Sequence, residues 1–292
     1  MKDFCLGLIA HASPLGKKQQ NLAATEYWVR QAKRKGADLV VLPELSITGH
    51  GGHPAMIAEA ERVPDGDAVN HITGLAAELG IYICAGIAES EAGAVYNTQF
   101  IVGPEGFIGK QRKVHLSHDE YFLFRGGTSV PVFDLPFACV GLVICYDNLL
   151  PEMARICAVR GAELILSPHA ARFGAWPRGL EGRRKAVANL KQQWRVIHRC
   201  RALENGVYVG LCNTVGRSAG GRHGVQANHA GGCMIVAPGG QVAAESRSRD
   251  IVEQMLIRRL QADKLHQVRR QICFNLRTRR SDAFEALAIA TE

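Results

Sequence analysis

The stretch Val140-Gly141-Leu142-Val143-Ile144-Cys145-Tyr146-Asp147 decides the fold of this chain. Its apolar run, bounded by a polar turn, predicts a buried strand over residues 137–144, and the periodic pattern that follows predicts a helix over 149–160. Cys145 then lies at a strand-to-helix turn. Such a turn suits a nucleophile, because N–H groups at a helix start favour a thiolate and can bind a developing oxyanion. Most buried cysteines only pack, so the position alone does not make Cys145 catalytic.

Two other apolar strands are followed by charged side chains. The run Leu39-Val40-Val41-Leu42 leads into Pro43-Glu44, and the strand over residues 107–109 is followed by Lys113. Ligands and chemistry gather at strand ends, so a base, a cation and a nucleophile can meet there. Taken singly, Glu44 and Lys113 are more simply interpreted as solvated surface charges. The catalytic hypothesis therefore depends on all three residues together.

Strand and helix patterns alternate along the whole sequence, which predicts a layered α/β fold. No linker rich in Pro, Gly or Ser divides the chain, so we expect a single domain over residues 1–292. The expected helices cover residues 18–35, 68–79, 149–160 and 183–204. The expected strands cover 4–10, 38–42, 81–87, 95–102, 107–109, 137–144, 164–167, 207–212, 233–236, 241–244 and 251–257, the last closing the sheet.

Composition is that of a chain with a large core and no membrane or secretion signal. The 292 residues are 47% hydrophobic, yet no apolar stretch approaches the length of a membrane span. The start Met1-Lys2-Asp3-Phe4-Cys5 lacks the layout of a signal peptide, so we expect a cytoplasmic protein. Nine cysteines, an odd number, favour reduced core thiols over a disulfide framework; besides Cys145 they are Cys5, Cys84, Cys139, Cys157, Cys200, Cys212, Cys233 and Cys273.

Neither metal nor nucleic acid is expected as a partner. The zinc candidates are His198 with Cys200, or His223 and His229 with Cys233, and neither set has paired ligand spacing. The net charge of +8 lies largely in Arg183-Arg184-Lys185 and in the C-terminal region, without interleaved aromatic residues. We interpret it as a solvated face or as subunit contacts, the latter for a tail from about residue 258. The glycine- and arginine-rich stretch 216–224 is interpreted as a mobile loop rather than a phosphate loop.

Three segments in order resemble the signatures of the nitrilase, or carbon–nitrogen hydrolase, superfamily. They are Leu42-Pro43-Glu44 followed by Gly49, Gln111-Arg112-Lys113-Val114-His115-Leu116, and Ile144-Cys145-Tyr146-Asp147 with Pro151-Glu152 and Arg155. The resemblance covers nearly the whole chain, with further likeness at Asp65-Gly66, Ala85-Gly86-Ile87-Ala88-Glu89, Tyr96-Asn97-Thr98, Gly103-Pro104-Glu105-Gly106, Asn213 and Gly216. It implies an α-β-β-α sandwich that associates into homodimers or larger homo-oligomers, and it implies Glu44, Lys113 and Cys145 as the catalytic set.

The same resemblance implies a second glutamate shortly after the lysine. The segment is His118-Asp119-Glu120-Tyr121-Phe122, and we assign the role to Glu120, with Asp119 as its rival. In the implied chemistry Glu44 accepts the thiol proton and later returns it to the departing nitrogen. The ammonium of Lys113 and the backbone N–H of Tyr146 stabilise the oxyanion. Glu44 then activates the water that hydrolyses the thioester.

The segment Pro168-His169-Ala170-Ala171-Arg172-Phe173 resembles the substrate-facing loop of the family. Arg172 is the candidate anchor for a substrate carboxylate, Arg125 is a weaker second, and His169 is unusual at its position. His115 is expected to support the Lys113 loop.

The expected activity is hydrolysis of a small linear amide or N-carbamoyl compound, without a cofactor. Alternatives are nitrile hydrolysis, a catalytically silent regulatory or assembly protein, and a basic nucleic-acid-binding module. The expected partners are a small amide or ureide substrate and further copies of the chain, with neither nucleic acid nor membrane.

Overall fold

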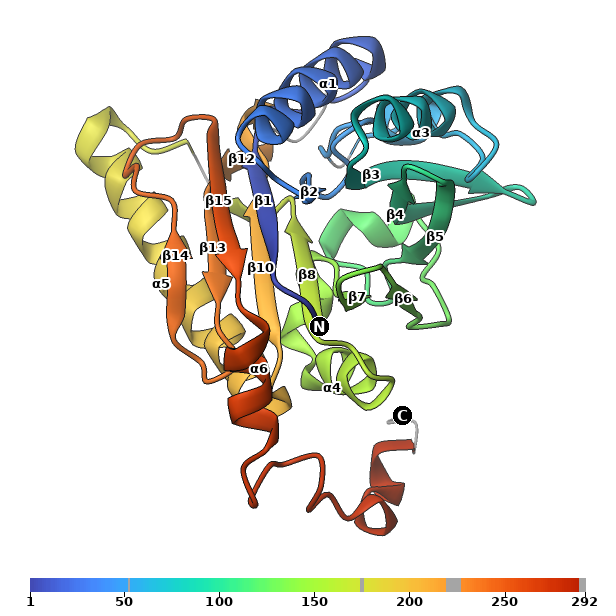
Figure 1. The fold of residues 1–292 in the computed structure, drawn as a ribbon. Helices are drawn as coiled ribbons and strands as arrows, with labels where there is room; N and C mark the ends of the chain where they lie inside the picture. Colours follow the sequence, from blue (N-terminus) through green and yellow to red (C-terminus); the bar gives the residue numbers. More distant parts are fainter. Residues whose placement is uncertain (52, 174–175, 219–226, 289–292) are drawn as a thin grey trace.

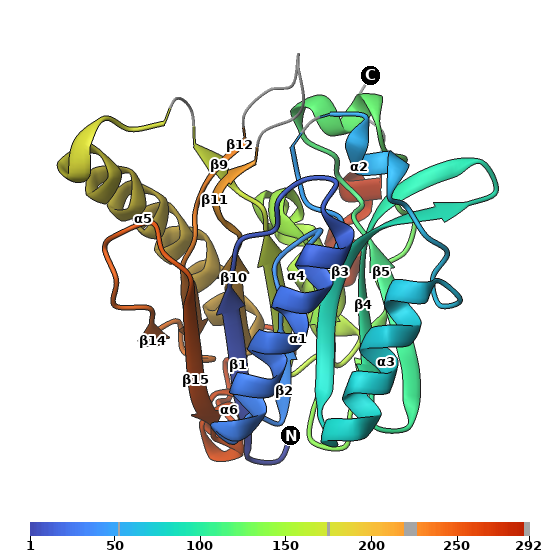
Figure 2. The same ribbon diagram turned by 90° about the horizontal axis from the view of Figure 1, so that it is seen from above.

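The computed structural model describes residues 1–51, 53–173, 176–218 and 227–288. Two six-stranded sheets pack face to face, and helices cover the outer face of each (Figure 1). Helices α1 (Lys18–Arg34) and α3 (Asp67–Leu79) lie next to each other on one side, as Figure 2 shows. Helices α4 (Pro151–Val159) and α5 (Gly179–Asn205) cover the other side. This confirms the expected α-β-β-α sandwich.

The first sheet has the order β15-β1-β2-β3-β4-β5. Its strands are β1 (Phe4–Ala10), β2 (Leu39–Val41), β3 (Tyr82–Glu91), β4 (Ala94–Gly103), β5 (Gly106–Arg112) and β15 (Gln254–Leu260). Strands β2 and β3 are parallel, whereas β3, β4 and β5 form an antiparallel meander. Since two reversals restore the direction, β2 and β5 run the same way. Their carboxyl ends, which precede Glu44 and Lys113, therefore lie at the same edge of the sheet.

The second sheet has the order β14-β13-β10-β8-β7-β6. Its strands are β6 (Val132–Asp134), β7 (Cys139–Leu142), β8 (Leu164–His169), β10 (Tyr208–Asn213), β13 (Cys233–Val236) and β14 (Val242–Glu245). The central strands β7, β8 and β10 are parallel. Cys145 follows β7 and His169 ends β8, so these two residues share one edge of this sheet.

Apolar side chains fill three layers of the sandwich. Along β1, Leu6 and Leu8 face the second sheet, whereas Ile9 packs on the side of α1 and α3. Trp194 of α5 belongs to the third layer, behind the second sheet. A central strand buried on both faces reads as a continuous apolar run, and each fully buried leucine contributes roughly 1.5–3 kcal/mol. The two sheets thus hold the edge with the charged residues on a rigid support.

Two predicted elements differ from the structure in a way that matters. The strand expected over residues 251–257 exists as β15, shifted to Gln254–Leu260, and it lies at the edge of the first sheet, where it pairs with β1. The alternation of apolar residues indicates a strand without naming its partner. The strand expected over 137–144 is shorter, because β7 ends at Leu142 and leaves Val143 and Ile144 to lead into the Cys145 turn.

A small third sheet was not predicted. It joins β11 (Val215–Ser218), β12 (Ala227–Ala230) and β9 (Arg172–Phe173). The loop expected over 216–224 is therefore wrong at its start, and residues 219–226 lie outside the described part of the chain, as does the zinc candidate His223. The short helix α2 (Ala55–Ala58) was also missed.

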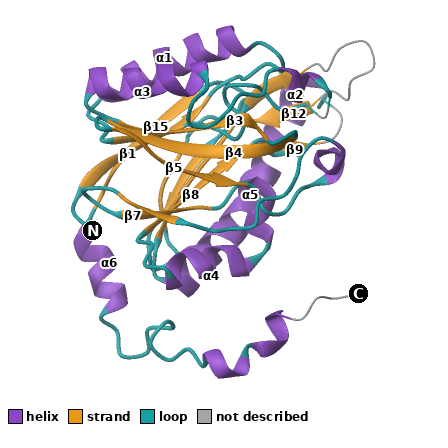
Figure 3. Cartoon of the chain, turned by 90° about the vertical axis from the view of Figure 1, so that its right-hand side faces the viewer, coloured by secondary structure: helices purple, strands orange, loops and turns teal. Residues whose placement is uncertain are grey.

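The C-terminal tail begins later than residue 258. Residues 258–260 belong to β15, and α6 (Ala262–Arg269) follows directly. Beyond it the chain leaves the layers, as Figure 3 shows. The role of this tail in subunit contacts stays a prediction. Among the described residues, no helix combines the length and the apolar character needed to cross a membrane.

All nine cysteines are free thiols. Cys84, Cys157, Cys212 and Cys233 are buried, as expected for core residues. Cys273 is exposed instead, because it lies in the segment that leaves the layers, and Cys200 is exposed on α5.

Candidate active site

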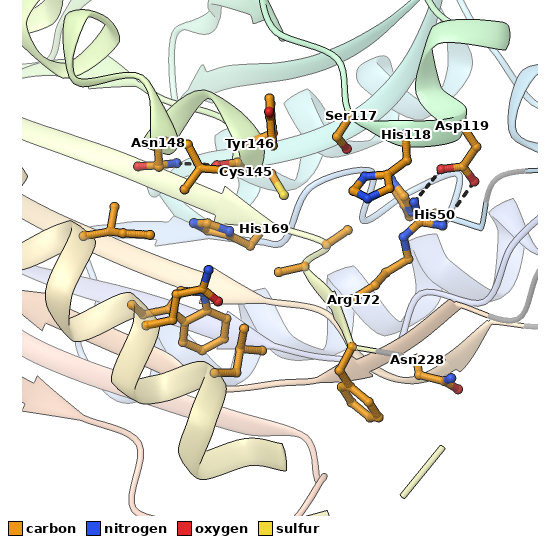
Figure 4. Close-up of a pocket in the computed structure, with 18 of the residues that line it drawn as sticks. His50, Ser117, His118, Asp119, Cys145, Tyr146, Asn148, His169, Arg172 and Asn228 are labelled. Atoms are coloured by element: carbon orange, nitrogen blue, oxygen red, sulfur yellow. Dashed lines mark hydrogen bonds and ion pairs between the residues drawn. The ribbon is translucent and has the colours of Figure 1, made fainter. Parts of the chain in front are cut away.

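The predicted catalytic residues meet at the common edge of the two sheets. Glu44, Lys113 and Cys145 come from the segments after β2, β5 and β7, which are far apart in the sequence. A cavity of about 1000 Å³ opens in front of Cys145 (Figure 4). Its lining also includes Tyr146, His169 and Arg172, so the structure brings most of the predicted site residues together.

Behind the cysteine lies a buried cluster of two carboxylates, one ammonium and one amide, which we call the carboxylate–ammonium cluster. The Nζ of Lys113 lies 2.8 Å from Oε1 of Glu44 and 2.6 Å from Oε2 of Glu120. The Nδ2 of Asn97 donates to both carboxylates, at 2.8 Å and 2.9 Å. All four residues are about 1% exposed. Every charge in the cluster therefore has partners within hydrogen-bond reach, as buried charges require.

Opposite charges set the ionisation of this cluster. Burial alone would lower the pKa of the Lys113 ammonium, but the charges of Glu44, Cys145 and Glu120 raise it above its ordinary value. Burial would likewise raise the pKa of the Glu120 carboxyl, but Lys113 and His50 hold it well below its ordinary value. Lys113 is therefore a fixed cation and Glu120 a fixed anion at neutral pH.

A local motif aims Glu120 and not Asp119 at the lysine. The short 3₁₀ helix His118–Phe122 begins with a capping box, in which Oε2 of Glu120 accepts from the backbone N–H and the hydroxyl of Ser117, at 2.9 Å and 2.7 Å. This reciprocal bond turns the Glu120 side chain inward. Asp119 points to the cavity instead, where it pairs with Arg172.

Glu44 is fixed from the opposite side by backbone groups. Its Oε2 accepts from the backbone N–H of Ala170, at 2.6 Å. The segment that carries Glu44 crosses β3 at Gly86, where an added Cβ would lie 2.4 Å from the backbone nitrogen of Leu45. Glycine is required at this crossing because any side chain would push Glu44 away from the cluster.

The turn that presents Cys145 is strained and held by its neighbours. Cys145 has a φ of 47°, in the left-handed region that costs energy for a residue with a side chain. The Nδ2 of Asn148 donates to the carbonyls of Val143 and Cys145, at 2.9 Å and 3.0 Å. Asp147 accepts from the backbone N–H of His115 at 2.8 Å and contacts Nδ1 of that histidine. His115 thus ties the Lys113 loop to the cysteine turn.

The thiol of Cys145 is partly accessible but has a raised pKa. Burial and the charge of Glu44 raise the pKa well above the ordinary value, and Lys113 opposes them. The turn was expected to favour a resting thiolate, whereas its surroundings favour the neutral thiol. A neutral thiol needs a base at the moment of attack, and Glu44 lies in position to accept the proton.

The two predicted arginines differ in position. Arg172 lines the cavity, but its Nη1 and Nη2 already lie 3.1 Å and 2.5 Å from the carboxylate of Asp119. Arg125 is exposed, and among the described residues it is not part of the cavity lining. The structure therefore gives no geometric support to Arg125 as a substrate contact.

His169 belongs to a network of neutral groups. The hydroxyl of Ser167 lies 3.0 Å from Oδ1 of Asn148, 2.9 Å from Nε2 of His169 and 3.0 Å from Nε2 of His198. Burial lowers the pKa of His198 to about 4 and, with His198 and Lys113 nearby, lowers that of His169 well below its ordinary value. Both rings are therefore uncharged at neutral pH, and His169 brings no positive charge to the cavity wall.

Comparison with known proteins identifies the family of the chain. The family model of the carbon–nitrogen hydrolases matches residues 6–270. The chain is 31% identical to the omega-amidase NIT2 of Mus musculus, over 97% of this chain and 98% of that one. It is 36% identical to a nitrilase of Pyrococcus abyssi, over 69% of this chain and 71% of that one. The chain belongs to the carbon–nitrogen hydrolase family.

Solved structures show the same fold. A carbon–nitrogen hydrolase from Helicobacter pylori G27 superposes with a TM-score of 0.84 at 24% identity, over 99% of this chain and 100% of that one. An amidase from Nesterenkonia sp. gives a TM-score of 0.76 at 24% identity, over 97% and 96%. These structures confirm the fold, and the family match over residues 6–270 confirms the predicted membership in the nitrilase, or carbon–nitrogen hydrolase, superfamily.

A metal does not fit the charged centre of this carbon–nitrogen hydrolase. Single ligand atoms of Glu44, His50 and Glu120 lie within 4.8 Å of one another. The ammonium of Lys113 already bridges the two carboxylates, so a cation placed there would meet a fixed positive charge. Of the zinc candidates within the described residues, His198 is fully buried while Cys200 is exposed.

Sequence reasoning missed several contributors to the site, among them Asn97 and a wall on α5. Asn97 was noted only as part of the family likeness, yet it bridges the two carboxylates. The cavity wall on α5 was missed as well; it consists of Leu190, Gln193, Trp194 and Ile197. Their spacing of three, one and three residues is that of one helix face, and this pattern could have been recognised in the sequence.

Proposed function

We propose that this carbon–nitrogen hydrolase cleaves the C–N bond of a small amide through a thioester at Cys145. The single observation that carries the proposal is the carboxylate–ammonium cluster directly behind a thiol that opens onto a cavity. Glu44 accepts the thiol proton as the sulfur attacks the carbonyl carbon, since the raised pKa of the Cys145 thiol requires a base.

The oxyanion is stabilised by the ammonium of Lys113 and by the backbone N–H of Tyr146. The 3₁₀ helix Cys145–Leu149 starts at the cysteine, and N–H groups of a first helical turn have no partner within the helix. Glu44 returns the proton to the departing nitrogen, and the C–N bond breaks. A water activated by Glu44 then hydrolyses the thioester and releases the acid. Glu120 positions Lys113 and does not exchange protons.

The acyl donors within this proposal are primary amides and N-carbamoyl compounds. Nitriles form the second candidate class, because a relative at 36% identity is named a nitrilase. A silent assembly protein would not need a thiol, a base and a fixed cation around one cavity, and the proposal therefore puts catalysis first.

The test is ammonia release from amides, omega-amides, N-carbamoyl amino acids, N-carbamoyl amines and nitriles, with wild type and Cys145→Ala side by side. We expect turnover by the wild type, a loss of at least about a thousandfold in Cys145→Ala, and no loss in the matched control Cys273→Ala, whose thiol is exposed outside the layers. Mass spectrometry of acid-quenched enzyme should show an acyl adduct on Cys145. Near-normal turnover by Cys145→Ala would falsify the proposal.

A further inference from the structure

The cavity has two unlike regions with Cys145 between them. Figure 4 shows Ser117, His118, Asp119, His50 and Arg172 grouped on one side, with Asn148 and Tyr146 on the other. Beyond Asn148 and Tyr146 the lining is formed by Leu149 and by the neighbouring face of α5, and it is apolar or aromatic at every position except Gln193, with Leu190, Trp194 and Ile197 as its other members. A ligand that reaches Cys145 therefore meets one polar and one apolar surface.

The apolar surface is built into the fold by one face of α5. Leu190, Trp194 and Ile197 lie at positions i, i+4 and i+7 of this helix, so they form a continuous stripe along the cavity. Trp194 is only 3% exposed and anchors the stripe in the core. Leu190 and Ile197 are partly exposed, and both line the cavity. Exposed apolar side chains at the wall of a site gain free energy when a ligand covers them.

The arginines of the cavity are already engaged. Arg172 forms a two-pronged ion pair with Asp119, and the guanidinium of Arg217 lies 5.2 Å from the ring centroid of Trp176. A substrate carboxylate would have to displace Asp119 from Arg172 and would leave that carboxylate without its cation. The neutral His169 and His198 do not supply a replacement charge. The wall thus disfavours an anionic acyl chain.

The space around the scissile bond is also uneven. The departing nitrogen must sit beside Glu44, whose side chain is completely buried and held by Lys113, Asn97 and the N–H of Ala170. A primary amide, whose leaving group is ammonia, needs the least space beside this buried carboxylate. The acyl part, bonded to Cys145, extends into the cavity of about 1000 Å³.

We propose, building on the function proposed above, that the preferred substrates are primary amides of uncharged carboxylic acids with a bulky apolar acyl chain, of arylalkyl size. The sulfur of Cys145 bonds to the carbonyl carbon, the C–N bond breaks, and the thiol proton leaves with ammonia through Glu44. Water then cleaves the thioester, so that one amide and one water give one acid and one ammonia. The α5 stripe binds the apolar chain in both steps.

The first experiment compares kcat/KM for three primary amides on the purified full-length enzyme. Butyramide is the reference, succinamate has a carboxylate at a similar chain length, and 3-phenylpropionamide adds an apolar ring. We expect 3-phenylpropionamide to exceed succinamate by about a hundredfold, with butyramide between them. A preference for succinamate over butyramide would overturn the proposal.

Two variants test the two walls separately. Ile197→Ala should lower the ratio of 3-phenylpropionamide to butyramide about tenfold, because it removes apolar contact only with the larger chain. Val196→Ala is the matched control, because Val196 is 58% exposed on the same helix and lies outside the described lining of the cavity. This variant should keep the wild-type ratio of 3-phenylpropionamide to butyramide. Asp119→Asn should raise the ratio of succinamate to butyramide about tenfold by releasing Arg172. Unchanged ratios in both Ile197→Ala and Asp119→Asn would contradict the assignment.

The outcomes separate the two proposals. Cys145-dependent hydrolysis of all three amides with no order among them would leave the proposed function standing and would refute the substrate class. Absence of Cys145-dependent hydrolysis from every amide, together with no acyl adduct on Cys145, would refute both.

Discussion

Asp119 and Glu120 are neighbours in the sequence, and each pairs with one cation, yet the two ion pairs differ in almost every physical respect. Glu120 and Lys113 are both 1% exposed, and Glu120 also accepts from Asn97 and Ser117. Asp119 and Arg172 are 24% and 21% exposed and lie at the cavity wall. Burial would raise the pKa of Asp119, but the pair with Arg172 lowers it, the same direction as for Glu120.

The difference shows how one turn can supply both a charge that the fold depends on and a charge that it does not. A buried pair cannot lose one partner without leaving an uncompensated charge, whereas a solvent-screened pair contributes little to stability. The 3₁₀ helix His118–Phe122 turns adjacent side chains in different directions, so that Glu120 joins the carboxylate–ammonium cluster and Asp119 lies at the cavity wall.

The largest expected effect comes from removing the shared cation. Lys113→Met leaves Glu44 and Glu120 buried without their ammonium, so the free energy of unfolding at neutral pH should fall by about 3–5 kcal/mol. Turnover should fall at least about a hundredfold, because the oxyanion loses its cation. Urea unfolding followed by circular dichroism, with ammonia release, measures both.

Lys35→Met is the control for this variant, because Lys35 is exposed at the end of α1 and its loss should change stability by less than about 0.5 kcal/mol. The stability deficit of Lys113→Met should shrink at acidic pH, where the unpaired carboxylates can take up protons. A variant as stable as the wild type at neutral pH would show that the cluster is not an interdependent buried unit.

A smaller loss in the free energy of unfolding is expected when the Glu120 side chain keeps its shape and loses its charge. In Glu120→Gln one side-chain oxygen becomes an amide N–H donor. If it replaces Oε2 it faces the donors Lys113 and Ser117, and if it replaces Oε1 it faces the donor Asn97. We therefore expect the free energy of unfolding to fall by about 1–3 kcal/mol. The same variant should lower kcat, since Lys113 is no longer positioned.

The pH dependence of this loss has a definite sign. The folded-state pKa of Glu120 is held well below the ordinary value of 4.5, so its stabilisation is present above about pH 4.5 and is lost as the pH falls through the folded value. The stability difference between wild type and Glu120→Gln should therefore be constant near neutrality and narrow only in more acidic solution. Urea unfolding over this range measures it, with the exposed Glu181→Gln as control. A difference that narrows already above pH 5 would contradict the lowered pKa.

The meeting of Glu44, Lys113 and Cys145 could be predicted from the sequence, because their positions are set locally and three motifs in order resemble one family. Glu44, Lys113 and Cys145 each follow an apolar run, and a strand presents its last residues at a sheet edge whatever its partners are. The choice of Glu120 over Asp119 was also within reach, since Ser117 and Glu120 have the spacing of a capping box. The same reasoning explains why β15 was recognised as a strand but its partner β1 was not, because pairing depends on residues far away in the sequence.

The substrate region was harder to predict because it depends on contacts between distant segments. From the sequence, Arg172 is expected to bind a substrate carboxylate. Only the structure shows that its guanidinium is already paired with Asp119. The third sheet, which carries Arg172 on β9, joins strands that are short and polar and give little periodic signal. The neutral state of His169 likewise follows from burial next to His198, which no spacing in the sequence reveals.

The smallest expected effect on stability comes from breaking the ion pair between Asp119 and Arg172. Asp119→Asn should cost less than about 1 kcal/mol in the free energy of unfolding, and moderate salt should reduce that cost further. The measurement is urea unfolding at low and moderate salt, with Arg172→Gln and the double variant completing a mutant cycle. A coupling energy as large as the loss in Glu120→Gln would mean that Asp119 and Arg172 form a structural anchor. A small, salt-sensitive coupling would mean that the pair contributes little to folding, and that Asp119 acts on substrate choice instead, because a bound carboxylate would take its cation and lie beside its negative charge.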